Sequence, residues 1–122
     1  MPKVNRWALL EHIGAPDDSR GIHFDLLLEH GDSCMTWRLQ ELPSLDGPPV
    51  VASALPLHNL EWLHKKKAVL SRGRGRTRQI MAGSFTGDLI PDQSNRIKLF
   101  LKNALLTFAL DIQNDQCQFR SI

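Results

Sequence analysis

Short stretches of alternating apolar and polar residues dominate this chain, and glycine, proline, aspartate and asparagine interrupt them. Successive side chains of a β-strand point to opposite faces, so the alternation predicts strands over residues 7–12, 22–29 and 33–39. A loop over residues 14–19 separates the first two strands, and a hairpin turn over residues 30–32 separates the second from the third. The first third of the chain is therefore expected to form three successive strands.

The middle of the chain carries turn residues and basic residues, with little helical signal. Residues 42–56 are rich in proline, which favours an extended connection over a helix. A single helical turn is expected near residues 59–64. Residues 67–82 predict a pair of strands around an Arg-Gly-Arg-Gly segment.

The end of the chain predicts a closing hairpin. Residues 97–102 and 105–110 have strand character and flank Asn103, a residue type that tolerates turn conformations. Many short strands with frequent turns are typical of a sandwich or a barrel. We therefore expect an all-β, mainly antiparallel fold with minor helix, either a sandwich or a barrel, in a single domain over residues 1–122.

Length and composition suit an ordinary globular domain. The chain has 122 residues, of which 42% are apolar and 23% charged, close to the averages for such domains. Its longest apolar runs, such as residues 26–28, are far too short for a transmembrane helix, and its start lacks the apolar stretch of a secretory signal. Its two cysteines show no metal-ligand spacing. These features predict a cytoplasmic protein with no membrane partner.

Positive charge is concentrated in one segment. Between Trp62 and Gly87 there is no acidic residue, and seven of the 15 Lys and Arg residues fall in that stretch: Lys65, Lys66, Lys67, Arg72, Arg74, Arg76 and Arg78. Such a local positive field attracts polyanions such as nucleic-acid backbones. The alternative is a solvated surface loop that only keeps the protein soluble.

One strand carries residues suited to metal binding. On the strand over residues 22–29, His23 and Asp25 share a face at a repeat of ~6.6 Å over two residues. An imidazole and a carboxylate projected side by side can bind one divalent cation. His12, at the end of the neighbouring predicted strand, can supply a third ligand, and three protein ligands with open positions is the arrangement of a catalytic metal. The alternative is a hydrogen-bonded surface pair.

A series of short motifs runs along the chain. They are Arg6–His12, His23–Glu29, Thr36–Leu39, Pro43-Ser44, His58–Trp62, Gly73–Gly75, Gly83–Gly87 and the hairpin Ile97–Leu110. In order and approximate spacing, over about nine-tenths of the chain, this series resembles the 3′-phosphoesterase module of bacterial DNA ligase D and its short stand-alone relatives.

The resemblance implies a fold, an activity and a site. That family folds as a compact β-barrel with its active site in a crescent groove, so the resemblance implies a compact single-domain β-barrel with its core at about residues 6–110. With a divalent metal, preferably manganese, it trims 3′-terminal ribonucleotides and 3′-phosphates from DNA or RNA-tipped DNA ends during repair. By resemblance, His12, His23 and Asp25 match the metal ligands, with zinc or cobalt as alternative metals. His58 matches the histidine that contacts the phosphate, and catalysis would rest on His58, His23 and Asp25, with a ligase or polymerase acting as a separate chain.

Two positions depart from the ligase D pattern. Leu27 stands where the family has a phosphate-gripping arginine, and Trp62 stands where it has a tyrosine. Leucine offers no hydrogen bond to phosphate, whereas an arginine fork makes two. Phosphate or nucleic-acid binding would therefore depend on other residues, and the candidates are Arg20, Trp62, Arg72, Arg74 and Arg76.

Three functions remain open from the sequence. The first is a metal-dependent phosphoesterase that processes 3′ ends of nucleic acid in DNA repair. The second is a non-catalytic nucleic-acid-binding module on the same barrel, favoured by Leu27 together with the basic segment. The third is a metal-dependent phosphatase for a small substrate, which would have no need of an extended basic surface.

Overall fold

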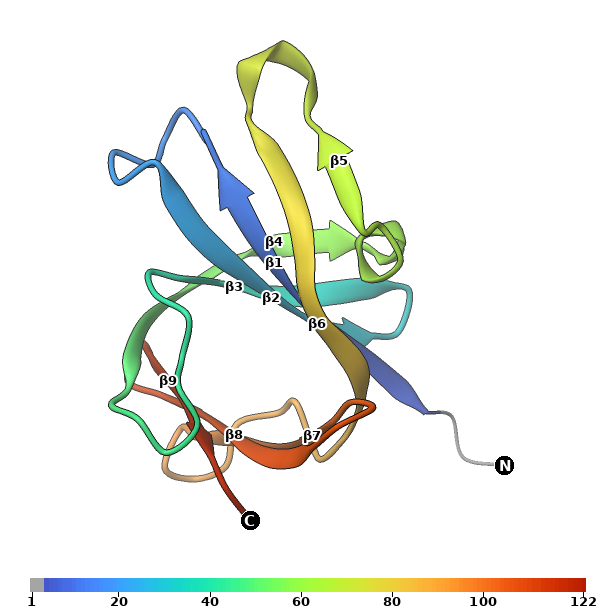
Figure 1. Ribbon diagram of the computed structural model, residues 1–122. Coiled ribbons are helices and arrows are strands. Elements are labelled where there is room, and N and C mark those ends of the chain that lie inside the picture. Colours follow the sequence, from blue (N-terminus) through green and yellow to red (C-terminus); the bar gives the residue numbers. More distant parts are fainter. Residues whose placement is uncertain (1–3) are drawn as a thin grey trace.

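The computed structural model describes residues 4–122, and nearly all of its regular structure is antiparallel β-sheet (Figure 1). Two short 3₁₀ helices, η1 and η2, complete the secondary structure. In chain order the elements are β1 (Asn5–Ile13), β2 (Ile22–His30), β3 (Ser33–Leu39), β4 (Val50–Asn59), η1 (Leu60–Leu63), β5 (Lys67–Val69), η2 (Ser71–Gly73), β6 (Arg76–Thr86), β7 (Ile97–Lys102), β8 (Thr107–Gln113) and β9 (Gln116–Arg120).

Pairing between β1 and β6 closes the sheet into a barrel. The nine strands follow the order β1-β2-β3-β4-β9-β8-β7-β6-β5, and β1 also pairs with β6. The 11-residue β6 pairs with β1 along most of its length, with β7 near its end and with β5 near its start. The β5–β6 hairpin therefore projects beyond the ring (Figure 1). The expected all-β, mainly antiparallel, single-domain barrel is confirmed.

The barrel interior holds the main core. Alternate residues of each strand point inward, as on β7, where Ile97, Leu99 and Leu101 are buried between exposed neighbours. Trp7 is buried in this core, packs edge-on against Phe108 and donates its indole N–H to the Lys102 carbonyl. The aromatic ring thus contributes apolar area while its polar atom keeps a hydrogen bond.

A second, smaller cluster lies on the other face of the first three strands, where η1 covers it. Its buried members are Ala8, Leu10, Leu27, Cys34 and Leu63. This face also carries the three candidate metal ligands. Because strand side chains alternate, it continues along β1 to His12 and along β2 to Asp25 and His23.

Two expectations about the elements need correction. Residues 42–56 were expected to be an extended connection, but β4 begins at Val50 and pairs with β3. Pro56 fits in this strand because the β3–β4 register shifts there, and a bulge tolerates a residue that cannot donate to the ladder. The strand β9 was not predicted, yet its Cys117 and Phe119 are buried in the main core. The other expected strands and the helical turn near residues 59–64 are present.

No helix within residues 4–122 has the length and apolar character needed to cross a membrane. The longest helical element there is the four-residue η1.

Candidate metal centre

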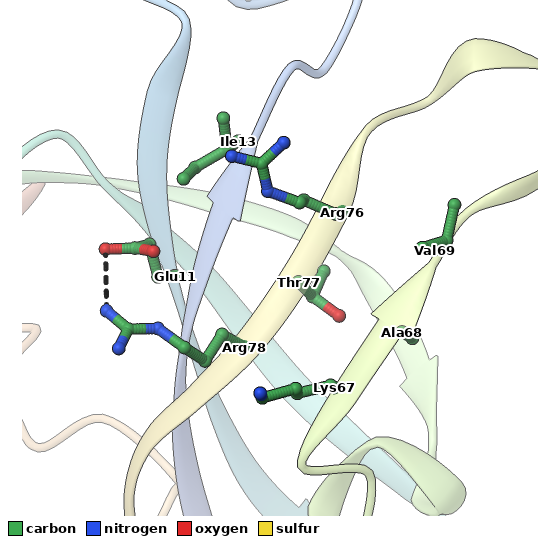
Figure 2. Close-up of a pocket in the computed structure, with 8 residues that line it drawn as sticks. All are labelled: Glu11, Ile13, Lys67, Ala68, Val69, Arg76, Thr77 and Arg78. Carbon is green, nitrogen blue, oxygen red and sulfur yellow. Dashed lines mark hydrogen bonds and ion pairs between the residues drawn. The ribbon is translucent and has the colours of Figure 1, made fainter.

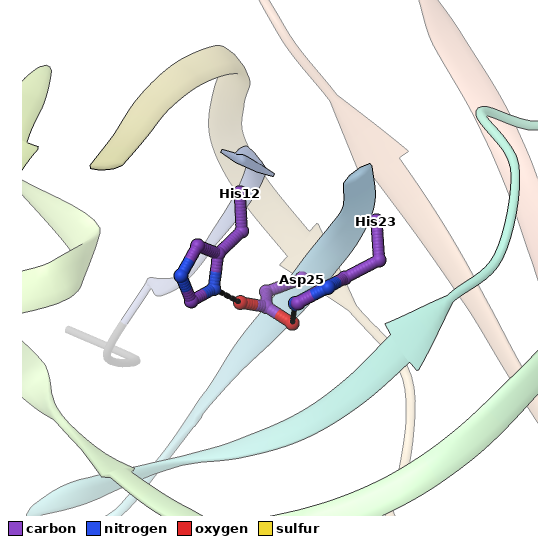
Figure 3. Close-up of side chains that lie close together, drawn as sticks. All are labelled: His12, His23 and Asp25. Atoms are coloured by element: carbon purple, nitrogen blue, oxygen red, sulfur yellow. Dashed lines mark ion pairs between the residues drawn. The ribbon is translucent and has the colours of Figure 1, made fainter. Parts of the chain in front are cut away.

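His12, His23 and Asp25 converge at one end of β1 and β2, with their side chains directed toward one another (Figure 3). The backbone positions of His12 and His23 are direct partners in the β1–β2 ladder, and Asp25 lies two residues further along β2. One possible ligand atom from each residue lies within 4.8 Å of the others. His23 and Asp25 lie on one face of β2, as expected, and His12 lies beside them, so the group can hold a metal ion.

Each histidine ring is oriented by a hydrogen bond on the side away from the other ligands. The Nε2–H of His12 donates to the Arg74 carbonyl at 2.8 Å, and the Nδ1–H of His23 donates to the Asp18 carboxylate at 2.8 Å. The other ring nitrogens, His12 Nδ1 and His23 Nε2, then face Asp25 at 3.6 Å and 3.3 Å. Metal-ligating histidines are held in the same way, by donation of the second ring N–H to a carboxylate or carbonyl.

Two buried atoms of this group lack the hydrogen-bond partner that buried polar atoms usually have. His23 Nε2 and Asp25 Oδ1 are buried and form no hydrogen bond of good geometry with any residue from 4 to 122. The residues themselves are only 2% and 6% exposed. An unsatisfied buried polar group costs about 1–3 kcal/mol, and a bound cation would remove that cost. The donor set of two imidazoles and one carboxylate suits a divalent transition metal.

Contacts within this group change the pKa values of two of its side chains, Asp25 and His12. Burial by itself would raise the pKa of Asp25, but the contacts of its oxygens with the His12 and His23 rings outweigh burial and lower this pKa to about 2. The contact with Asp25 is the main reason that the pKa of His12 is raised, and burial opposes that shift. The carboxylate is therefore ionised at neutral pH and ready to bind a cation.

Glycine allows the β5–β6 hairpin to approach His12 closely. Gly75 has a φ of +94°, and a Cβ on it would overlap the Ile13 carbonyl oxygen and the Gly14 backbone. This contact brings the neighbouring carbonyl of Arg74 within reach of the His12 ring. The Arg-Gly-Arg-Gly segment thus has a packing role in addition to its positive charge.

A cleft of about 490 Å³ opens over the metal group. His12 and Asp25 contribute to its floor, and His58, Trp62 and Arg74 line it as well. The Nδ1–H of His58 donates to the Pro56 carbonyl at 2.9 Å, which leaves Nε2 for other partners. Trp62 packs against the smaller apolar cluster and also lies 4.7 Å from the Lys65 ammonium. The structure thus brings three of the proposed site residues into one cleft with the metal group.

The other basic residues singled out from the sequence lie elsewhere. Arg20 donates to the Gln40 side chain, and Arg72 is exposed in the hairpin tip with a φ of +59°. Arg76 lines a second concavity of about 510 Å³. Figure 2 shows this surface, where Arg78 of β6 is paired with Glu11 of β1 and faces Lys67 of β5 across the ladder, while Arg76 lies further along β6, near Ile13. The basic segment is therefore divided between the metal cleft and a separate surface.

Two residues near the metal group were not singled out from the sequence. Asp18 lies in the β1–β2 loop, where the sequence offered no pattern that would place it against His23. Arg38 lines the metal cleft from β3. The alternation of β3, which puts Trp37 and Leu39 in the barrel core, already implied that Arg38 points to the opposite face.

Comparison with known proteins gives no assignment for this chain. No known protein family matches it, and no curated protein is significantly similar to it.

Proposed function

We propose that this protein is a metal-dependent phosphoesterase that processes the 3′ ends of nucleic acids. The observation that carries the proposal is the pair of buried, unsatisfied atoms, His23 Nε2 and Asp25 Oδ1, within the part of the chain that the structure describes. They belong to a three-residue group of metal-ligand type beneath an open cleft. A metal that is accessible from a cleft is suited to catalysis, whereas structural sites are closed.

A divalent cation held there would act as a Lewis acid on a phosphoryl group. His12, His23 and Asp25 would coordinate the cation, and Asp18 would keep His23 in the orientation that binds it. His58 has its Nδ1–H committed to Pro56, so Nε2 is the atom that exchanges a proton or hydrogen bond with the substrate. A histidine side chain can act as a general acid that protonates a leaving oxygen.

Other residues of the cleft suit a nucleic-acid end. Trp62 lines the cleft, and an unpaired base would stack on its ring by displacing the Lys65 ammonium that lies 4.7 Å away. Arg74, in the β5–β6 hairpin, adds positive charge to the lining of the cleft. The resemblance to the ligase D 3′-phosphoesterase module supports a 3′-phosphate or a 3′-ribonucleotide as the group removed, manganese as the metal, and a separate ligase or polymerase as the later partner in DNA repair.

The test is trimming of a primer–template that ends in a 3′-phosphate or a 3′-ribonucleotide, with and without Mn²⁺. Trimming should require the metal and should be lost in His23→Ala. The variant His58→Ala should bind metal normally but turn over about 10²- to 10⁴-fold more slowly, the range for loss of a general acid or base. His30→Ala is the matched control, since His30 is exposed at the end of β2. Trimming that persists in His23→Ala would contradict the proposal.

A second candidate is a non-catalytic nucleic-acid-binding barrel. Leu27, at the position of the family's phosphate-binding arginine, is fully buried in the smaller cluster and cannot reach a substrate. The surface of Lys67, Arg76 and Arg78 would bind a phosphate backbone without any chemistry. Salt-sensitive binding of the same duplex, with no trimming at any metal concentration, would favour this function.

A further inference from the structure

Arg38 reaches the metal cleft from the strand next to the ligands. It is the direct ladder partner of Asp25 in the β2–β3 pairing, and it lines the cleft together with His12 and His58. Its side chain is 25% exposed. The guanidinium is therefore close to the metal group and still accessible to a molecule in the cleft.

The hydrogen-bonding capacity of Arg38 is mostly unused. One terminal nitrogen contacts the Asp17 carboxylate at 3.2 Å. Its Nε is buried and has no hydrogen-bond partner among residues 4–122. A guanidinium has five N–H donors, so a buried Nε without an acceptor carries a desolvation cost. Once Asp17 is displaced, the terminal nitrogens can donate to the acceptor oxygens of a ligand in the cleft.

The contact with Asp17 is easily displaced. The Asp17 side chain is 70% exposed, and ion pairs with such exposed carboxylates contribute little to stability. Asp17 also lines the cleft, so its carboxylate contacts the guanidinium from the side on which a ligand in the cleft would bind. Asp17 is thus a counter-ion that a ligand can replace, and its contact with Arg38 is not a structural link.

We propose that Arg38 forms an anion subsite beside the metal group, which takes the oxygens of a phosphoryl group in exchange for Asp17. An arginine fork matches the geometry of phosphate oxygens through two parallel hydrogen bonds. Arg38 thereby supplies, from β3, the phosphate contact that Leu27 on β2 cannot make. The identification of the phosphate as that of a nucleic-acid end rests on the proposed function.

The test uses inorganic phosphate as the probe and calorimetry on the full chain loaded with Mn²⁺. Arg38→Gln should weaken phosphate binding about tenfold or more, as expected for loss of hydrogen bonds to a charged group. The affinity for Mn²⁺ should stay the same or increase, because a positive charge near the cation is removed. Arg38→Lys, which keeps the charge without the fork, should fall between wild type and Arg38→Gln.

Two further variants sharpen the test. Asp17→Asn should bind phosphate more tightly than wild type, because the competing carboxylate is gone. Lys98→Gln, which removes an exposed positive charge on β7, should bind phosphate like wild type. A merely structural role for Arg38 would predict the opposite pattern, with weaker binding of both phosphate and Mn²⁺ in Arg38→Gln and no gain in Asp17→Asn.

The outcomes separate this inference from the proposed function. Wild-type phosphate affinity in Arg38→Gln, or failure of the Mn²⁺-loaded wild type to bind phosphate, would overturn the subsite. Arg38-dependent phosphate binding without any trimming of nucleic-acid ends would leave the subsite standing and contradict the proposed function. Normal trimming of nucleic-acid ends by Arg38→Gln would support the proposed function and contradict the subsite.

Discussion

The Nε2–H of His12 donates to the main-chain carbonyl of Arg74 at 2.8 Å, across 62 residues of sequence. This hydrogen bond determines which nitrogen of His12 faces Asp25. Asp18, in the β1–β2 loop, does the same for His23 of the neighbouring strand by accepting from Nδ1 at 2.8 Å. Backbone and loop groups thus orient both rings so that their free nitrogens face one carboxylate.

Mn²⁺ is expected to stabilise the wild-type protein against unfolding and to lose this effect in Asp25→Asn. A ligand that binds only the folded state at 100 times its Kd contributes about 2.7 kcal/mol, which is a shift of several degrees in Tm for a domain of this size. Thermal unfolding followed by circular dichroism, with and without metal, measures the shift. An equal shift in wild type and Asp25→Asn would show that the metal binds elsewhere.

Asp18→Asn is expected to lower the affinity for Mn²⁺ by about 10- to 100-fold, the usual effect of losing a residue that orients a metal-binding histidine. The amide keeps the size of the side chain but can present its NH₂ group to His23, which favours the wrong tautomer. Asp32→Asn, in the exposed β2–β3 turn, is the control for loss of one negative charge. Calorimetric titration with Mn²⁺ gives both affinities, and equal values would exclude the orienting role.

Gly75→Ala is expected to weaken metal binding, and Gly73→Ala is not. Both glycines have positive φ, +94° and +68°, so both substitutions add similar backbone strain of about 1 kcal/mol. Only at Gly75 would the new Cβ meet the Ile13 and Gly14 backbone, whereas at Gly73 it would meet no described atom within 4 Å. Pushing the hairpin away would withdraw the Arg74 carbonyl from His12. Equal Mn²⁺ affinities in the two variants would contradict this role.

The metal-free protein is expected to lose stability in acid through Asp25. Its pKa is about 2 in the folded protein against an ordinary value of 3.8, so the unfolded chain takes up the proton first as the pH falls. The stabilising contribution of Asp25 is complete above about pH 4 and is lost as the pH falls through about 2. Urea unfolding across this range should show the wild type losing more stability than Asp25→Asn. Parallel pH profiles for the two proteins would be inconsistent with the lowered pKa.

The two cysteines are expected to be unreactive in the folded protein. Burial, with a smaller effect of the Glu29 charge, raises the pKa of Cys34 to about 11, and burial with the Asp111 charge raises that of Cys117 to about 12. Because the thiolate is the reactive form, a thiol reagent at neutral pH should label them only as the protein unfolds. Labelling in native buffer at the rate of a free thiol would contradict this expectation.

Alternation along the chain was enough to predict the first three strands, the β5–β6 pair and an all-β fold of the sandwich or barrel type. It also placed His23 and Asp25 on one face, because side-chain direction in a strand is a local property with a period of two residues. The same logic failed for β4 and β9. The proline residues around β4 obscured that strand. The short β9 is held in place by partners on β8 and β4, and β4 is distant from it in the sequence.

Tertiary structure alone decided how the site is completed. The register between β1 and β2 set His12 beside His23, and the hairpin contact through Gly75 brought the Arg74 carbonyl to His12. The positive segment looked like one unit in the sequence, yet alternation on β6 and the turn at its tip divided it between two surfaces. Sequence patterns specify the face of a strand, whereas the distance between residues on different strands depends on long-range pairing and loop closure, which no local pattern contains.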